Sequence, residues 1–196
     1  MFNEATAQKG DILLYRSESG LVGGLISFFS NLGRKVKYGG QYVHTACYVG
    51  GGRVIHSHLE VDQTTWIQGA KETGVHKARI PQYEYDFIDV YRVPTPLTYN
   101  EQMKLISWLN TKLGKKYDLA AFPASFVRSV LARLFGWSNF RKDRPILNDD
   151  DRWFCSELVS MAYQEALGIE INPAIHPMSQ TPSDLAGKNS ILIKIS

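Results

Sequence analysis

Cysteine is scarce in this sequence, whose 196 residues contain only two, Cys47 and Cys155. Two cysteines so far apart in a chain of this size do not indicate a disulfide-stabilised scaffold. The opening segment MFNEATAQKGDI lacks the basic and apolar stretches of a secretory signal. No apolar run reaches the roughly 18–20 residues that a membrane-spanning helix needs. These absences predict a cytoplasmic protein in a reducing setting, although a phage- or host-delivered protein would have the same composition.

An excess of charge of either sign is also lacking, because the net charge is +3 and the pI is near 8.8. This balance is too small to predict a nucleic-acid partner. No zinc-finger spacing, P-loop or GxGxxG motif is present, so no cofactor is expected. A composition with 44% hydrophobic and 21% charged residues excludes disordered and collagen-like classes. A single domain over residues 1–196 is expected, with a helical insertion at about 119–150.

The stretch YVHTACYVGGGRVIHSH, residues 42–58, is typical of a β-hairpin. Three adjacent glycines separate two runs of β-branched and aromatic residues, and glycine tolerates the positive φ angles of a tight turn. Because side chains alternate faces along a strand, His44 shares a face with Ala46, and His56 shares a face with His58. Imidazoles of two neighbouring strands are therefore expected close together.

The spacing leaves the pairing of these imidazoles open. A turn centred on Gly51 sets His44 opposite His58, with His56 as the diagonal neighbour, still within side-chain reach at ~7–8 Å. A turn centred on Gly50 sets His44 opposite His56 instead.

Further strands and helices are predicted from hydrophobic periodicity and from the residues that begin and end them. Strands are expected at residues 12–15, 74–79, 87–93 and 190–195. A helix opens at the capping box formed by Thr98 and Glu101 and ends at Gly114, and a second helix covers residues 153–167. The apolar segments 21–32 and 125–135 have helical spacing, which indicates core helices, with a lipid-contacting surface as the alternative.

Cys155 lies in the first turn of the second helix, at the positive end of the helix dipole. This position is expected to lower the pKa of the thiol and to favour the reactive thiolate. An imidazole within reach would complete a nucleophile and general acid pair, oriented by a third polar group. Cys47 alternates onto the face opposite His44 and is interpreted as a packing residue.

The remaining histidines have weaker interpretations. His58 is expected to be a solvated residue at the end of a strand, and His76 and His176 lie in loop-like sequence without an obvious partner. A metal site is the alternative to catalysis, in which His44, His56 and Cys155 ligate zinc with His58 as a fourth ligand. The histidines come from a hairpin and not from a helical HxxxH or CxxC frame, which disfavours this alternative.

Four motifs together resemble a known family. They are GDILLYR (10–16), HTACYVGGGRVIHS (44–57), GKKYDLAAF (114–122) and FCSELVSMAYQEALG (154–168). They are similar to the permuted papain-like family that includes the YaeF and YiiX amidase-like proteins. The chain is more distantly similar to the NlpC/P60 peptidases and to the lecithin:retinol acyltransferase group. Residues 139–151 and 60–74 match nothing in these families.

The resemblance implies an α+β, circularly permuted papain-like (NlpC/P60-type) fold, with an antiparallel sheet or barrel packed against helices. It places Cys155 at the nucleophile, His44 at the base and His56 at the third position. Amidase-like members often have glutamate at this third position, whereas the acyltransferases have histidine. Tyr117 matches a position that lines the substrate pocket, and Glu157 matches a structural position.

The implied function is that of a cysteine hydrolase which cleaves an amide bond in a peptide, peptidoglycan peptide or N-acyl compound. Two alternatives stay open, a lipid acyltransferase or acylhydrolase and a non-catalytic binding module on the same fold. The expected partner is a small-molecule, peptide or acyl-lipid substrate, with peripheral membrane contact under the lipid alternative. Neither the natural substrate nor the oligomeric state follows from the sequence.

Overall fold

The computed structural model describes residues 2–16, 42–59, 73–80, 87–118 and 151–195 of the chain. The predicted helical segments 21–32 and 125–135 lie outside these residues, as does the expected insertion at 119–150. Within the described residues, no helix combines the length and the apolar character that crossing a membrane requires.

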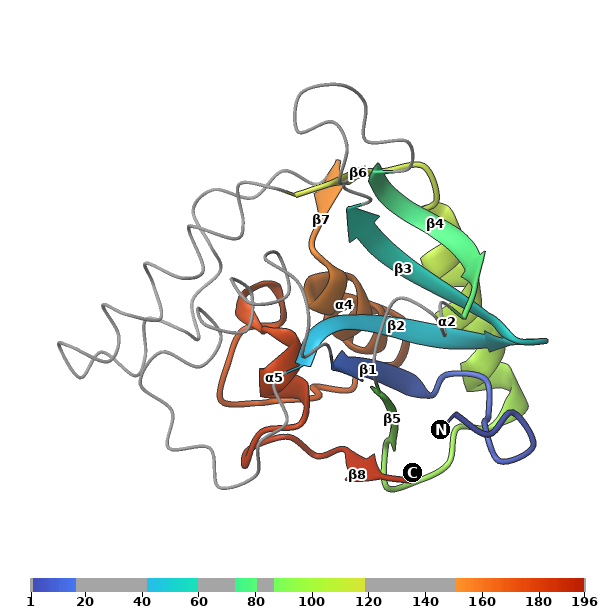
Figure 1. Cartoon of the computed structure of the whole chain (residues 1–196). Helices are drawn as coiled ribbons and strands as arrows, with labels where there is room; N and C mark the ends of the chain where they lie inside the picture. Colours follow the sequence, from blue (N-terminus) through green and yellow to red (C-terminus); the bar gives the residue numbers. More distant parts are fainter. Residues whose placement is uncertain (1, 17–41, 60–72, 81–86, 119–150, 196) are drawn as a thin grey trace, which may run out of the picture.

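A six-stranded sheet forms the centre of the fold (Figure 1). Every pairing in it is antiparallel, and the spatial order is β4-β3-β2-β1-β5-β8. The strands are β1 (Ile12–Arg16), β2 (Tyr42–Gly50), β3 (Arg53–Leu59), β4 (Thr73–Arg79), β5 (Phe87–Arg92) and β8 (Ile193–Lys194). The strands predicted from the sequence are present, and the last one is shorter than the apolar run 190–195 indicated.

The predicted hairpin is formed by β2 and β3. Positive φ angles at Gly50, Gly51 and Gly52 (93°, 62° and 66°) make the turn, a conformation that glycine adopts without strain. Cys47 pairs with Ile55 and Tyr48 pairs with Val54. This register is the one centred on Gly51, so the alternative centred on Gly50 is wrong.

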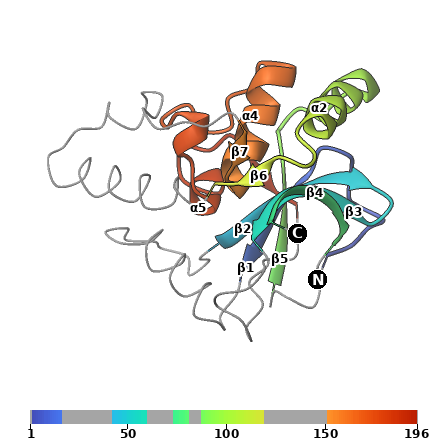
Figure 2. The same ribbon diagram turned by 90° about the horizontal axis from the view of Figure 1, so that it is seen from above.

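The sheet is buried on both faces. One face packs on the helices α2 (Tyr99–Thr111) and α4 (Cys155–Leu167), which lie together on one side of the sheet (Figure 2). Cys47 belongs to that core and is fully buried, as its alternation predicted. The opposite face has its own buried cluster, to which Ala46, Tyr48 and Val54 contribute. The strand periodicity therefore assigns the hairpin histidines to the face away from the helices.

The helix α2 begins as the sequence predicted. The Thr98 hydroxyl accepts the Glu101 N–H at 3.4 Å, and the Glu101 carboxylate accepts the Thr98 N–H at 2.8 Å. The helix ends at Thr111 with Lys112 as its C-cap, two residues before the expected Gly114. Gly114 follows instead in the turn that leads to β6 (Lys116–Tyr117), where its positive φ of 82° reverses the chain.

The helix α4 begins at Cys155, two residues later than predicted. Trp153 belongs to the short strand β7 (Arg152–Trp153), which pairs in parallel with β6. The carboxylate of Glu157 accepts the N–H of Phe154 at 3.2 Å, which satisfies one backbone donor at the start of the helix. Gly168 ends the helix in the left-handed conformation, as expected.

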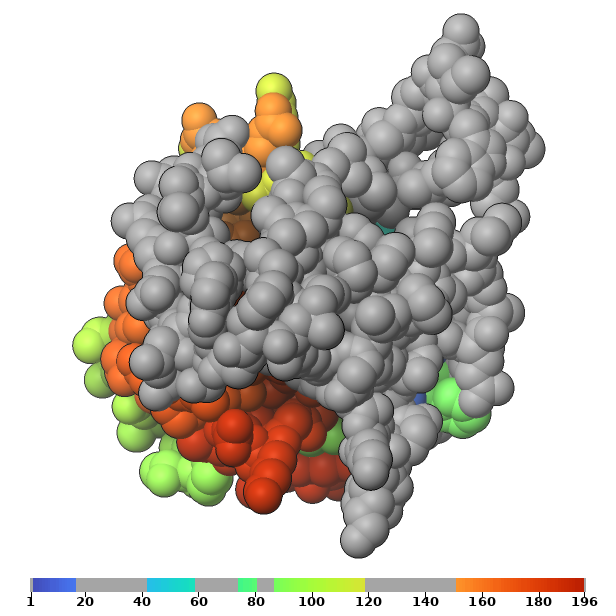
Figure 3. Space-filling view, turned by 90° about the vertical axis from the view of Figure 1, so that its left-hand side faces the viewer, coloured from blue at the N-terminus to red at the C-terminus, as the bar shows by residue number. Residues whose placement is uncertain are grey.

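The chain after α4 packs against the first turns of that helix. It forms the 3-10 turn η2 (Pro177–Ser179), the short helix α5 (Pro182–Leu185) and then β8. Gln180 connects the two parts, because its carbonyl accepts the Ser156 hydroxyl and its side chain accepts the Ser160 hydroxyl. Figure 3 shows these C-terminal residues (red) along the lower surface and the β6–β7 pair (yellow and orange) above them.

Candidate functional site

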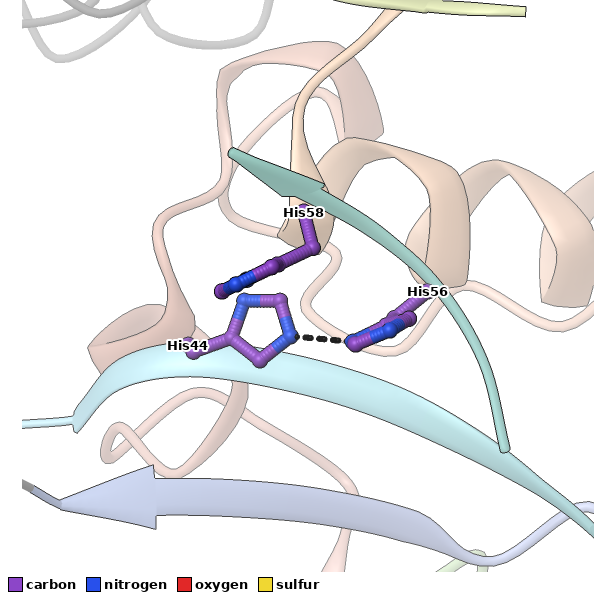
Figure 4. A group of neighbouring side chains, drawn as sticks. All are labelled: His44, His56 and His58. Carbon is purple, nitrogen blue, oxygen red and sulfur yellow. Dashed lines mark hydrogen bonds between the residues drawn. The ribbon is translucent and has the colours of Figure 1, made fainter. Parts of the chain in front are cut away.

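The hairpin brings three imidazoles together on the sheet face away from the helices. His44 extends from β2, and His56 and His58 extend from β3 toward it (Figure 4). Nε2 of His44 and Nδ1 of His56 are 2.8 Å apart and share a hydrogen bond. The ring centroids of His44 and His58 are 5.3 Å apart. The predicted convergence of hairpin imidazoles is therefore present.

The hydrogen bond of His44 runs diagonally across the hairpin. Continuing the observed register along the strands places His44 opposite His58, with His56 opposite Ala46. Diagonal neighbours on one face of an antiparallel pair lie within reach of long side chains. His44 is thus hydrogen-bonded to its diagonal neighbour His56, although His58 is the residue that the continued register places directly opposite.

His58 differs from its sequence-based interpretation. Its ring stacks on that of His56 with an interplanar angle of 6° and centroids 5.3 Å apart, and the residue is half-buried. His58 lies at the end of β3, as expected, but it is only partly solvated, because the neighbouring imidazole covers one face of its ring.

His76 also differs from its interpretation. It was interpreted as a loop-like residue without an obvious partner, although the strand predicted at 74–79 includes it; the structure places His76 in β4, directly opposite His56 in β3. Nε2 of His76 lies 3.0 Å from Nε2 of His56. Four of the five histidines of the chain thus form one group, called here the histidine cluster: His44, His56, His58 and His76.

Burial keeps the two central imidazoles neutral. His44 is 5% exposed and His56 is 2% exposed. Desolvation lowers the pKa of both rings well below the ordinary value, and the neighbouring imidazoles of the cluster lower it further. Neutral imidazole is the form that can take a proton from a thiol or bind a metal ion.

Acid is expected to destabilise the fold through these two rings. In the unfolded chain an imidazole gains its proton near pH 6.5, whereas buried His44 and His56 stay neutral, so stability falls as the pH drops. As the pH falls from 7.5 to 5.5, each ring should lower the free energy of unfolding by about 1.4 kcal/mol. Urea unfolding at pH 7.5 and at pH 5.5 measures this drop in stability. In His44→Gln the drop should be about 1.4 kcal/mol smaller than in wild type. An equal loss in both proteins would show that His44 is not held neutral by the fold.

Cys155 starts α4 and is 1% exposed. Burial raises the pKa of its thiol to about 12, and hydrogen bonds from the backbone N–H groups of Thr45, Ser156 and Cys155 itself oppose this shift only in part. The expectation of a lowered pKa is therefore wrong. The helix dipole acts as a partial positive charge that favours the thiolate, but the desolvation that comes with complete burial disfavours it more strongly.

Two strand contacts position the segment that leads into α4. The N–H of Thr45, the residue after His44, donates a hydrogen bond to the Cys155 sulfur. The hydroxyl of Ser57, which lies between His56 and His58, donates to the Trp153 carbonyl at 2.6 Å. The Cys155 segment is consequently attached to the hairpin through the residues that flank the histidines in sequence, although it is far away along the chain.

The other predicted residues occupy less central positions. The Tyr117 ring lies against Phe154, the residue before Cys155, with centroids 5.8 Å apart. Glu157 caps the helix start, as the structural interpretation predicted. His176 lies outside the cluster, where its Nδ1 accepts the N–H of Met178 at 3.3 Å.

The residues that could hold a metal ion are His44, His56 and His58. One ligand nitrogen from each lies within 4.8 Å of the others. Cys155 does not belong to this set, so the metal site drawn from the sequence, with Cys155 as a ligand, is corrected to a histidine set. A metal bound through Nε2 of His44 and Nδ1 of His56 would replace their hydrogen bond.

Sequence reasoning missed three contributors to this site: His76, Thr45 and Ser57. The backbone N–H of Thr45 and the hydroxyl of Ser57 act on a segment about 100 positions away, and no local pattern reports that contact. His76 had a signal that could have been used. If residues 74–79 pair with the second hairpin strand, His76 falls on one of its two faces, and the observed register makes it the one that carries His56.

Comparison with known proteins locates the fold. No protein-family model matches the sequence, and no curated protein gives a significant match. The solved structure of YiiX from Escherichia coli O157:H7, described as a metalloprotein, is similar with a TM-score of 0.52 and 23% sequence identity. The match covers 84% of this chain and 69% of YiiX. The predicted resemblance to YiiX is confirmed at the level of the fold: the chain has a mixed α+β, YiiX-like architecture with an antiparallel sheet packed against helices.

Proposed function

We propose that the protein is a cysteine hydrolase that cleaves an amide bond through a thioester acyl-enzyme, on a circularly permuted papain-like fold. The observation that carries the proposal is the attachment of the Cys155 segment to the hairpin. The N–H of Thr45, the residue after His44, contacts the Cys155 sulfur, and the hydroxyl of Ser57, the residue between His56 and His58, donates to the Trp153 carbonyl. A helix-start thiol bonded to the strand residue next to His44, together with a hydrogen-bonded pair of imidazoles on the same hairpin, has the composition of a Cys–His–polar triad.

The chemistry starts from two neutral groups. Burial raises the pKa of Cys155 and lowers that of His44, so proton transfer accompanies attack instead of preceding it. The sulfur of Cys155 attacks the amide carbonyl carbon while His44 takes the thiol proton. His44 then returns the proton to the departing amine, and a thioester remains on Cys155.

The second half of the reaction reverses these roles. Water attacks the thioester carbonyl and His44 takes a proton from it. The C–S bond breaks, the acid product leaves, and the proton returns to the sulfur of Cys155. His56 orients His44 throughout by the 2.8 Å hydrogen bond. Backbone N–H groups at the start of α4 supply the donors that the tetrahedral oxyanion requires.

Trapping the acyl-enzyme tests the proposal. Wild-type protein is mixed with a panel of N-acyl amide, dipeptide amide and acyl ester substrates, quenched in acid and measured by intact mass. A mass increase equal to the acyl group, located on the peptide that contains Cys155, is expected with amides. Acylation of Cys47, or turnover without any adduct and with full activity in Cys155→Ala, would refute the proposal. Reaction with esters alone would redirect it to the acylhydrolase alternative.

A metal-binding function is the second candidate, favoured by the three ligand nitrogens within 4.8 Å and by the description of YiiX as a metalloprotein. Neutral imidazoles are good zinc ligands, and burial keeps His44 and His56 neutral. The donor set thus fits a divalent transition metal in its chemistry. In that case the three imidazoles would hold the ion, which would act as a Lewis acid toward a carbonyl or a bound water.

Replacing His58 separates the two candidates. For a hydrolase that uses His44 and His56, His58→Gln should change kcat by less than about tenfold, since the imidazole stacks on His56 without a role in proton transfer. For a three-histidine metal site, the same variant should weaken zinc binding by about 100-fold or more, because one of three ligands is lost. Isothermal titration with zinc and steady-state kinetics on both proteins provide the comparison. Wild-type protein without measurable zinc affinity would eliminate the metal candidate.

A further inference from the structure

His76 is the one member of the histidine cluster that neither the hydrolase nor the metal candidate uses. It faces His56 across β3 and β4, and the two ring centroids are 4.5 Å apart. Directly paired residues of an antiparallel sheet point to the same side, so the rings meet without any distortion of the strands. His76 is half-buried, whereas His56 is 2% exposed. His76 therefore forms the outer end of a row of imidazoles.

The second nitrogen of His76 contacts its own strand. Nδ1 lies 3.1 Å from the carbonyl oxygen of Gly74. The turn before β6 holds the backbone here in place, because the Val75 N–H donates to the Lys115 carbonyl and the Gly114 N–H donates to the Val75 carbonyl, both at 2.8 Å. The row of hydrogen bonds through His44, His56 and His76 thus ends on the Gly74 carbonyl, whose position is fixed by these backbone contacts.

The chemistry of that carbonyl decides where each proton lies. A carbonyl oxygen accepts hydrogen bonds and cannot donate one, so the proton of neutral His76 is on Nδ1. Its Nε2 is then an acceptor, to which the Nε2–H of His56 donates a hydrogen bond at 3.0 Å. Nδ1 of His56 is in turn an acceptor, to which the Nε2–H of His44 donates a hydrogen bond at 2.8 Å.

This direction has a consequence for His44. With the proton on Nε2, the lone pair of His44 is on Nδ1, the nitrogen that is not engaged with His56. In the opposite direction His44 would carry its proton on Nδ1 and present its lone pair to His56. A base with that tautomer cannot take the thiol proton of Cys155 at Nδ1.

We propose that His76 is a positioning residue which, through its hydrogen bond to the Gly74 carbonyl, sets the tautomers of His56 and His44 so that His44 keeps a basic Nδ1. The proposal rests on the hydrolase function for its catalytic meaning, whereas the tautomers themselves can be observed without any substrate. His76 acts only through His56 and does not touch the reacting atoms.

Three variants separate tautomer control from a structural role. In His76→Gln the side-chain amide can still donate to Gly74 and accept from His56, so the direction is kept. In His76→Phe the acceptor is lost and the ring volume is retained. His176→Asn is the matched control, because His176 lies outside the cluster and asparagine also caps a helix start.

Nitrogen NMR of the imidazole rings at pH 8 is the primary measurement, with only five histidines to assign. Wild type, His76→Gln and His176→Asn should show the proton of His44 and His56 on Nε2, and His76 in wild type should carry it on Nδ1. In His76→Phe, His44 should shift to a mixture of tautomers or to Nδ1–H. An unchanged His44 tautomer in His76→Phe overturns the proposal. A wild-type spectrum with the protons of His44 and His56 on Nδ1 also overturns it, and that measurement does not depend on any variant folding.

Kinetics add the catalytic consequence. The rate falls with the fraction of competent tautomer, so kcat of His76→Phe should drop by about tenfold with KM within about twofold, and His76→Gln should recover to within about threefold. Equal losses in both variants would contradict tautomer control. If wild type turns over no substrate of the panel, the hydrolase proposal fails while the NMR result still decides the assignment of tautomers.

Discussion

Replacing Cys155 by alanine is expected to lower kcat by at least about 1,000-fold on any amide that the wild-type protein hydrolyses. The sulfur forms the covalent bond in the proposed reaction, and removal of a nucleophile typically eliminates all but background catalysis. The fold should tolerate the change, since alanine fills most of the volume of a small buried thiol. Steady-state kinetics together with a thermal unfolding curve of the same sample measure both effects.

Cys47→Ala is the matched control for this result. Cys47 is as buried as Cys155 but lies on the helix-facing side of β2, within the hydrophobic core. Its loss should leave kcat within about threefold and cost about 1 kcal/mol of stability, because only one small apolar contact disappears. If Cys155→Ala kept wild-type turnover, or if Cys47→Ala abolished it, the nucleophile would be assigned wrongly.

Replacing Gly74 by alanine is expected to destabilise the protein by about 3–5 kcal/mol, the largest stability effect among the positions considered. Gly74 has a φ of +127°, a conformation that residues with a β-carbon rarely adopt. A β-carbon there would also overlap the backbone carbonyl of Lys115. That carbonyl accepts the Val75 N–H, so it cannot move without breaking the contact between β4 and β6. Urea unfolding with linear extrapolation gives the free-energy difference.

Gly51→Ala separates the steric overlap from the backbone strain. Gly51 also has a positive φ, +62°, but no atom lies within 4 Å of the place where its β-carbon would be. This variant should therefore cost only about 1 kcal/mol, the typical penalty for the left-handed conformation. A similar loss at both positions would mean that β4 does not pack tightly on β6. The Gly74 variant should also disturb the carbonyl that contacts Nδ1 of His76.

Local sequence pattern was sufficient for the elements around the site. Alternation in the hairpin correctly placed His44 and His56 on one face and Cys47 on the other, because side-chain direction along a strand depends only on the parity of the residue number. The capping box at Thr98 and the glycine at 168 were likewise visible, since capping involves residues within one helical turn. The choice between the two turn centres could not be made, because three glycines allow either one.

Tertiary burial was beyond the reach of the sequence, and it changed the interpretation of the thiol. The helix-start position of Cys155 is a local property, and it favours the thiolate. Its 1% exposure is a global property, produced by β2 and β3 on one side and the C-terminal segment on the other. Desolvation is the larger effect and raises the pKa of the thiol, so the reaction proposed above uses a general base in place of the ion pair that the sequence indicated.

The sequence by itself determined that a hairpin carries three imidazoles and that Cys155 lies in the first turn of a helix, because strand parity and helix capping are local. Only the tertiary structure decided which groups meet. The register of β3 against β4 brings His76 to His56, and the contacts of Thr45 and Ser57 bring the Cys155 segment to the hairpin. Such contacts join residues 20 to about 100 positions apart, and they depend on how strands and helices pack rather than on any pattern within a segment.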